Sequence, residues 1–166
     1  MTHGSTPALV AVPLLDRAGI ARRIPHHGRM CLLDALCAWS PETVHCSASD
    51  HRDPGHPMRT ASGLLAPCAI EYAAQAMALH GGLVAEARSP DVAPDPRPGF
   101  IASVRSVRLQ VSRLDDVAGD LQVHATRLSG DDRQVLYAFR VAADDGRTLA
   151  EGRAVVVLDT PLPAAT

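Results

Sequence analysis

The residue that stands out chemically is a carboxylate inside an apolar, alanine-rich segment. Glu71 lies in CAIEYAAQAMALHGGLVAEA (68–87), and Gln75 follows four residues later, on the same face of a helix. Two interpretations are open. Glu71 complements the positive end of the helix dipole, or apolar surroundings raise its pKa and hold it ready as an acid. The dipole opposes that rise, so the residues alone favour neither.

Histidines supply a candidate partner for Glu71. Six of the eight precede this helix, and His51 and His56 lie in the loop SDHRDPGHPMR (49–59) that leads to it. A neutral imidazole suits the removal of a proton from carbon α to a carbonyl, and Glu71 would then protonate a departing hydroxyl. Backbone N–H groups at the helix start would polarise the carbonyl oxygen. Such an elimination of water requires no metal and no nucleotide, so we expect no cofactor.

Other arrangements of the same residue types are less specific. Four potential metal ligands lie close together in the sequence: His45, Cys46, His51 and His56. Their spacing is irregular and matches no known metal-binding signature, so we expect no metal site. No serine stands in a G-x-S-x-G setting, which argues against a serine hydrolase. The His26-His27 pair follows a proline, and we interpret it as a turn or helix-end feature.

Composition narrows the class of protein. The chain has 166 residues, which suits one domain, and a net charge of −2, which gives no basic field for nucleic acid. The longest uncharged stretch, 72–85, is shorter than the roughly 20 residues that span a bilayer. The first fifteen residues lack the basic start of a signal peptide, so we expect a cytoplasmic protein with no membrane span. No two of the four cysteines form C-x-x-C, and we expect buried, reduced thiols: Cys31, Cys37, Cys46 and Cys68.

Hydrophobic periodicity and turn residues predict the elements. We expect a short helix over 16–23 capped by Asp16, a hairpin of 30–39 and 43–49, and a long helix from Pro67 that weakens or ends at Gly81-Gly82. Four antiparallel strands follow, over 100–114, 120–128, 134–143 and 148–158. One long helix and so many strands make two layers only if the sheet wraps around the helix. The expected organisation is a lead-in over 1–19, one domain over 20–160 and a tail over 161–166.

Several segments resemble a known family. AIEYAAQAMALHGGL (69–83) resembles the EAMAQ-type helix of the hotdog-fold β-hydroxyacyl-ACP dehydratases. IPHHGRMCLLDAL (24–36) resembles the L-P-H-R-x-P-x-L-L-V-D segment at the start of these proteins. GDLQV (119–123) resembles the P-G-D-x-L sequence that leads into one of their later strands. Together with HRDPGHPMR (51–59) and GFIASVRSV (99–107), they are similar to the small dehydratases of aryl polyene biosynthesis clusters. The resemblance runs from about residue 20 to 160. It implies an α+β hotdog fold, in which a curved antiparallel sheet wraps a long central helix.

The resemblance also implies a site at a dimer interface. In the general dehydratases, the helix Glu and the His of an H-F-P-G-x-P loop come from different protomers. Glu71 matches the Glu, and His51 matches the His with one extra residue in the loop, while His56 is the rival by spacing. The longer approach MRTASGLLAPCA (58–69) departs from the family pattern. Cys68 and Ala69 are the candidate oxyanion donors there.

The implied function is dehydration of a 3-hydroxyacyl chain on the phosphopantetheine arm of an acyl carrier protein. Arg59 is a candidate for recognising the carrier or its arm, and Gln75 for binding substrate. We expect a homodimer, formed by pairing of an open strand edge, or a heterodimer with another hotdog chain. A hotdog thioesterase and a non-catalytic, acyl-carrier-binding partner of an active dehydratase are the alternatives, because the fold alone does not fix the function.

Overall fold

The long helix α2 (Ala69–Arg88) forms one layer of the structure, a computed structural model that describes residues 12–96 and 99–158. A 3-10 turn, η3 (Ala66–Cys68), leads into it and carries Pro67 in its first turn. The helix does not end at Gly81-Gly82, as one expectation had it. Leu83 beyond them is buried, and Glu86 pairs with Arg23 at 2.8 Å, so contacts on the far side hold the last turn in place.

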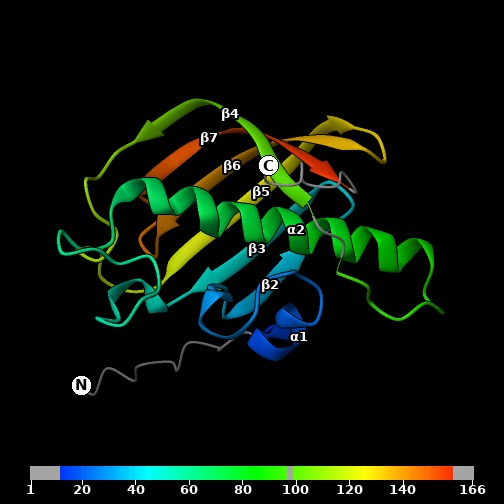
Figure 1. Ribbon diagram of the computed structural model, residues 1–166, viewed down its shortest axis with the longest axis horizontal. Helices are drawn as coiled ribbons and strands as arrows, with labels where there is room; N and C mark the ends of the chain where they lie inside the picture. Colours follow the sequence, from blue (N-terminus) through cyan, green and yellow to red (C-terminus); the bar gives the residue numbers. More distant parts are fainter. Residues whose placement is uncertain (1–11, 97–98, 159–166) are drawn as a thin grey trace, which may run out of the picture.

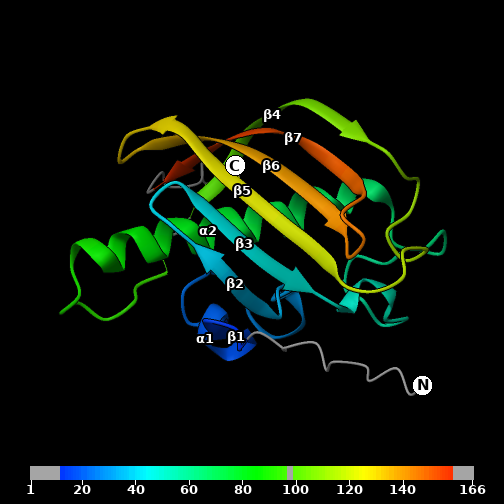
Figure 2. The same cartoon turned by 180° about the vertical axis from the view of Figure 1, so that it is seen from behind.

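An antiparallel sheet forms the other layer and curves around α2 (Figures 1 and 2). Its seven strands lie in the order β1-β2-β3-β5-β6-β7-β4, so that β1 and β4 are the two edges. The strands are β1 (Leu15–Asp16), β2 (Ala35–Trp39), β3 (Thr43–Ala48), β4 (Gly99–Leu109), β5 (Leu121–Gly130), β6 (Gln134–Ala143) and β7 (Thr148–Leu158). This is the expected helix wrapped by a curved sheet.

The core lies between α2 and the concave face of the sheet. Along β5, Leu121, Val123 and Ala125 are buried, while Gln122 and His124 between them face the other way and are half-buried. The predicted limits of β6 and β7 are confirmed to the residue. The predicted strand over 100–114 ends earlier, at Leu109.

The first strand of the predicted hairpin begins later than expected. Residues 28–30 form a 3-10 turn, η1 (Gly28–Met30), and regular pairing starts only at Ala35. The chain between them buries Leu32 and Leu33 completely, so these apolar residues serve the core without joining the sheet. The apolar run that predicted a strand there reflects burial in the core rather than pairing in the sheet.

Ahead of the hairpin, the short helix α1 (Arg17–Ala21) begins as predicted. The Asp16 carboxylate accepts a hydrogen bond from the Gly19 amide at 2.8 Å, which caps the helix. Residues 15–19, placed in the lead-in from the sequence, thus belong to β1 and α1, and Leu15 pairs with Leu36 of β2. Residues 1–11 of the predicted lead-in and the predicted tail, 161–166, lie outside the described residues.

The prediction of buried thiols holds for two of the four cysteines. Cys31 and Cys46 are buried and Cys68 is half-buried, but Cys37 is exposed, because its place in β2 turns its side chain away from α2. All four are free thiols. Over the residues that the structure covers, no helix has the length and apolar character needed to cross a membrane.

Candidate active site

Glu71 lies in the first turn of α2, and its partner is a histidine from the loop before β2. His26 Nε2 is 3.0 Å from Glu71 Oε1, and Gln75 Nε2 donates to the same oxygen at 3.0 Å. His26 and Glu71 keep 27% and 30% of their side chains exposed, so the pair is held by the protein and still reachable from outside. Two fixed donors on one oxygen orient the carboxylate.

The Gln75 side chain connects this carboxylate to the loop that carries His26. Gln75 is fully buried, and its Nε2 also donates to the Met30 carbonyl at 2.7 Å, while its Oε1 accepts from the Leu32 amide at 2.8 Å. Both polar atoms of the amide are therefore used. These two bonds hold residues 30–32 against α2 and so help to set the distance between His26 and Glu71.

The surroundings of Glu71 favour its charged form. Burial raises the pKa of this carboxyl, but the hydrogen bonds from His26 and Gln75 outweigh it, so that the pKa lies below its usual value. Of the two interpretations that the sequence left open, the contacts of this chain do not favour the one in which apolar surroundings raise the pKa of Glu71. Among the described residues, no hydrogen bond reaches Glu71 Oε2. The site presents an ionised carboxylate with one oxygen held and the other available.

The second ring nitrogen of His26 is buried and makes no hydrogen bond to the described residues. Nε2 faces a carboxylate and so carries the proton, while Nδ1 is buried with no hydrogen-bond partner among the described residues. A buried polar nitrogen without a hydrogen-bond partner is uncommon in folded proteins. Two atoms of the pair are thus without a hydrogen bond among the described residues, Glu71 Oε2 and the buried His26 Nδ1.

His51, the base expected from the sequence, lies elsewhere in this chain. It stands in the 3-10 turn η2 (Asp50–Arg52), is fully buried, and its Nε2 donates to the Val117 carbonyl at 3.0 Å. Its Nδ1 has no partner in the described residues. No contact joins His51 to Glu71 in the described chain, so its role as the base stays a prediction.

His56, the rival base, belongs to a buried network. Its Nδ1 accepts from the Met58 amide at 3.1 Å, so the proton sits on Nε2, which donates to the Tyr72 hydroxyl at 3.0 Å. That hydroxyl donates in turn to Asp50 Oδ1 at 2.8 Å. Both ring nitrogens are engaged, and burial lowers the pKa of His56. This geometry makes His56 a neutral residue that fastens the 50–58 loop to α2.

The stability of that fastening can be tested with Tyr72→Phe. The change removes one hydroxyl from a fully buried ring and leaves both His56 Nε2 and Asp50 without their partner. We expect a loss of about 1–3 kcal/mol in the free energy of unfolding, the usual cost of stranding buried polar groups. Urea denaturation measures it. An unchanged midpoint would show that the network contributes nothing to stability.

The other candidate site residues are occupied by structural contacts. The amide of Cys68 donates to the Leu65 carbonyl at 3.0 Å, and that of Ala69 bonds back to the carbonyls of residues 66 and 67, so neither is a free oxyanion donor here. Arg59 pairs with the buried carboxylate of Asp115 at 3.0 Å. A cluster of three or more metal-ligating side chains does not occur among the described residues.

Sequence reasoning missed His26, although its segment was part of the resemblance. The segment IPHHGRMCLLD carries two functions in the structure. Its histidine reaches Glu71, and its Asp34 accepts from the Ser49 amide and hydroxyl, both at 2.6 Å. The shared motif itself was the signal that could have pointed to His26, because two segments that one family shares, here the Glu71 helix and the N-terminal motif, can be expected to meet.

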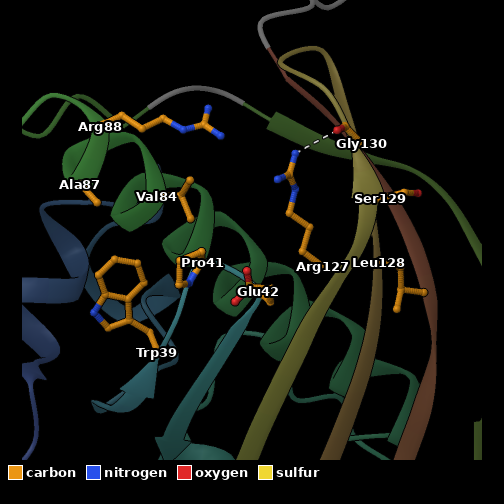
Figure 3. A pocket seen from close by; sticks show the side chains of 10 residues that line it. All are labelled: Trp39, Pro41, Glu42, Val84, Ala87, Arg88, Arg127, Leu128, Ser129 and Gly130. Atoms are coloured by element: carbon orange, nitrogen blue, oxygen red, sulfur yellow. Dashed lines mark hydrogen bonds between the residues drawn. The ribbon is translucent and has the colours of Figure 1, made fainter.

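A hollow of about 390 Å³ lies at the opposite end of α2 (Figure 3). Its walls come from the hairpins β2–β3 and β5–β6 and from the last turns of the helix. Trp39 and Glu42 line one side, and Arg127, whose Nη2 donates to the Gly130 carbonyl at 3.0 Å, lines the other. Glu71 does not border it. The hollow is therefore separate from the carboxylate–histidine pair.

Comparisons with known proteins identify the family and the fold. The ApeP-like family, described as ApeP dehydratase, matches residues 18–164. A similar solved structure is the dehydratase heterocomplex ApeI:P from Xenorhabdus doucetiae, with a TM-score of 0.74, 24% identity, and coverage of 90% of this chain and 92% of that one. The curated proteins contain no match.

Thioesterases share the fold at lower similarity. One from Haemophilus influenzae has a TM-score of 0.53 and 10% identity, and covers 80% of this chain and 82% of its own. A mutant thioesterase from Staphylococcus aureus has a TM-score of 0.51 and 12% identity, with coverage of 76% and 93%. At these identities the matches show the hotdog fold alone, which confirms the predicted fold class.

Proposed function

The chain belongs to the ApeP-like dehydratase family, and from that premise we propose its substrate and mechanism. The substrate is a 3-hydroxyacyl thioester on the phosphopantetheine arm of an acyl carrier protein, and the product is the trans-2-enoyl thioester. The setting is aryl polyene or fatty-acid-like synthesis. The observation that supports this best is the Glu71 carboxylate, held at Oε1 by His26 and Gln75 and open at Oε2.

In the proposed reaction Glu71 acts first as a base. Oε2 takes the proton from C2 of the acyl chain, the C2–H electrons form the C2=C3 bond, and the C3–O bond breaks. The proton then passes from Glu71 to the departing hydroxyl, which leaves as water, and the carboxylate is restored. His26 and Gln75 orient the carboxylate throughout. The lowered pKa of Glu71 supports this order, because the base must be ionised before the substrate arrives.

A second chain completes this proposal. β4 is an edge strand whose residues are mostly exposed, and an open edge is a template for pairing. We propose that it pairs with another hotdog chain, either a second copy or a different protein as in the ApeI:P complex. Such a partner would enclose the acyl chain, and it would offer a second route by which a histidine such as His51 reaches Glu71.

The direct test is mass spectrometry of an intact carrier. The purified chain is incubated with a 3-hydroxyacyl carrier protein, alone and after mixing with a partner hotdog chain. Loss of one water from the acyl group is the expected result. Loss of the whole acyl group would instead identify a thioesterase. An unchanged carrier in the presence of binding, with turnover only when a partner is added, would identify a non-catalytic subunit.

A further inference from the structure

We propose that the outer face of the sheet binds a phosphate group between Arg105 of β4 and Arg153 of β7. This site lies on the face of the sheet that points away from α2, and it is distinct from the Glu71–His26 pair. Arg105 and Arg153 are direct partners in the β4–β7 register. Like charges placed opposite each other on neighbouring strands repel, so the arrangement calls for a compensating anion.

The neighbouring pair along the same two strands makes the contrast clear. Arg108 stands opposite Glu151, and its Nη1 lies 3.3 Å from that carboxylate. Neither Arg105 nor Arg153 has a comparable partner: in the described part of the chain, no carboxylate pairs with either guanidinium. The sheet therefore neutralises one arginine of this face and leaves two adjacent ones with their charge uncompensated.

The two arginines line a hollow that also offers hydroxyl groups. It measures about 330 Å³, and its lining includes Ser103 and Ser106 of β4 beside the two guanidiniums. Leu136 and Val155 complete the walls. The volume is ample for a tetrahedral oxyanion, and the two guanidiniums and two hydroxyls can each donate hydrogen bonds to such an anion.

The backbone at Ser106 departs from ordinary strand geometry at this place. Its φ is +54°, and among the described residues it is the one non-glycine residue with a positive φ. The register of β4 against β7 shifts between Arg105 and Arg108, so a bulge brings Ser106 to the rim of the hollow. Bulges of this kind re-aim side chains at the edges of sheets.

A phosphate group of this description has two possible sources. One is free inorganic phosphate. The other is the phosphodiester of a phosphopantetheine arm, and this second source rests on the function proposed above. Binding of inorganic phosphate is measured without any turnover, so its failure and a failure of the dehydration assay are separate results.

The experiment is calorimetric titration of the full chain with inorganic phosphate, in chloride buffer at constant ionic strength. We expect binding in the millimolar range. Arg105→Gln and Arg153→Gln should each weaken it by at least about tenfold, since each removes one charge-assisted contact. Arg133→Gln, an exposed arginine on the β5–β6 hairpin, is the matched control and should bind within twofold of the wild type. Equal binding by the double variant Arg105→Gln/Arg153→Gln would overturn the proposal.

Thermal unfolding gives a second readout from the same variants. In phosphate-free buffer of low ionic strength, Arg153→Gln should melt above the wild type, because the repulsion is gone, and phosphate should stabilise the wild type alone. Equal stabilisation of both proteins by phosphate would refute the site.

Titration with 4′-phosphopantetheine and with pantetheine then identifies the source of the phosphate group. Tighter binding of the phosphorylated arm than of inorganic phosphate supports the arm, and equal binding supports the free anion.

Discussion

Glu71→Gln is expected to lower the rate of dehydration at least about 10²-fold, the usual size of an acid–base contribution. The change removes the charge and the basicity of the group while keeping its size. The amide can still accept from His26 or Gln75 at one oxygen, so the start of α2 should hold its conformation. Turnover of a 3-hydroxyacyl carrier, measured by mass spectrometry, reports the rate, and the far-ultraviolet circular dichroism spectrum reports the fold.

His26→Gln is the companion variant and should cause a loss of similar size. It removes the donor that faces Glu71 Oε1, and the pKa of Glu71 should rise because one of the hydrogen bonds that lower it is gone. His27→Gln is the matched control, since His27 is the exposed neighbour in the same loop. Full activity of His26→Gln together with a large loss of activity in His51→Gln would contradict this assignment and indicate that His51 is the base.

The long helix and its carboxylate were predictable because local physics determines them. Pro67 suits the turn at its start, and the alanine-rich sequence that follows favours a helix and allows close packing on several sides. The strands β6 and β7 were predictable for the same reason, since their alternation matches burial on one face. At Leu32 and Leu33 a continuous apolar run is buried in the core without joining the sheet, and the prediction of a strand over 30–34 was wrong.

The partner of Glu71 was less predictable because it depends on a long-range contact. His26 and Glu71 are 45 residues apart, and the buried amide of Gln75 bonds the loop of one to the helix of the other. A motif resemblance placed both segments in one family without placing them together. The loop motif favoured His51 and the spacing to Glu71 favoured His56, but their ring nitrogens bond to Val117 and Tyr72 instead.

Acid should destabilise the protein through its buried neutral histidines. His56 and His80 are both buried, and burial lowers the pKa of each. His80 Nε2 donates to the Ser40 carbonyl at 3.0 Å, and its Nδ1 accepts from the Tyr137 hydroxyl at 2.9 Å. In His80, as in His56, the nitrogen that would take a second proton already accepts a hydrogen bond. The unfolded chain takes up these protons near pH 6.5, and the folded chain only at lower pH.

The sign of the effect follows from that difference. Below about pH 6.5 the unfolded state binds more protons, so the free energy of unfolding falls as the pH falls, by at most about 1.4 kcal/mol per pH unit for each histidine. Asp50 works in the opposite direction, since burial raises its pKa, and it offsets part of the loss.

Urea denaturation across this range measures the slope of the free energy of unfolding against pH. His80→Phe should be less stable throughout but show a shallower slope, whereas His27→Gln should keep the slope of the wild type. A slope equal in His80→Phe and the wild type would mean that His80 takes up its proton without cost, and that the buried bonds to Ser40 and Tyr137 do not hold it neutral.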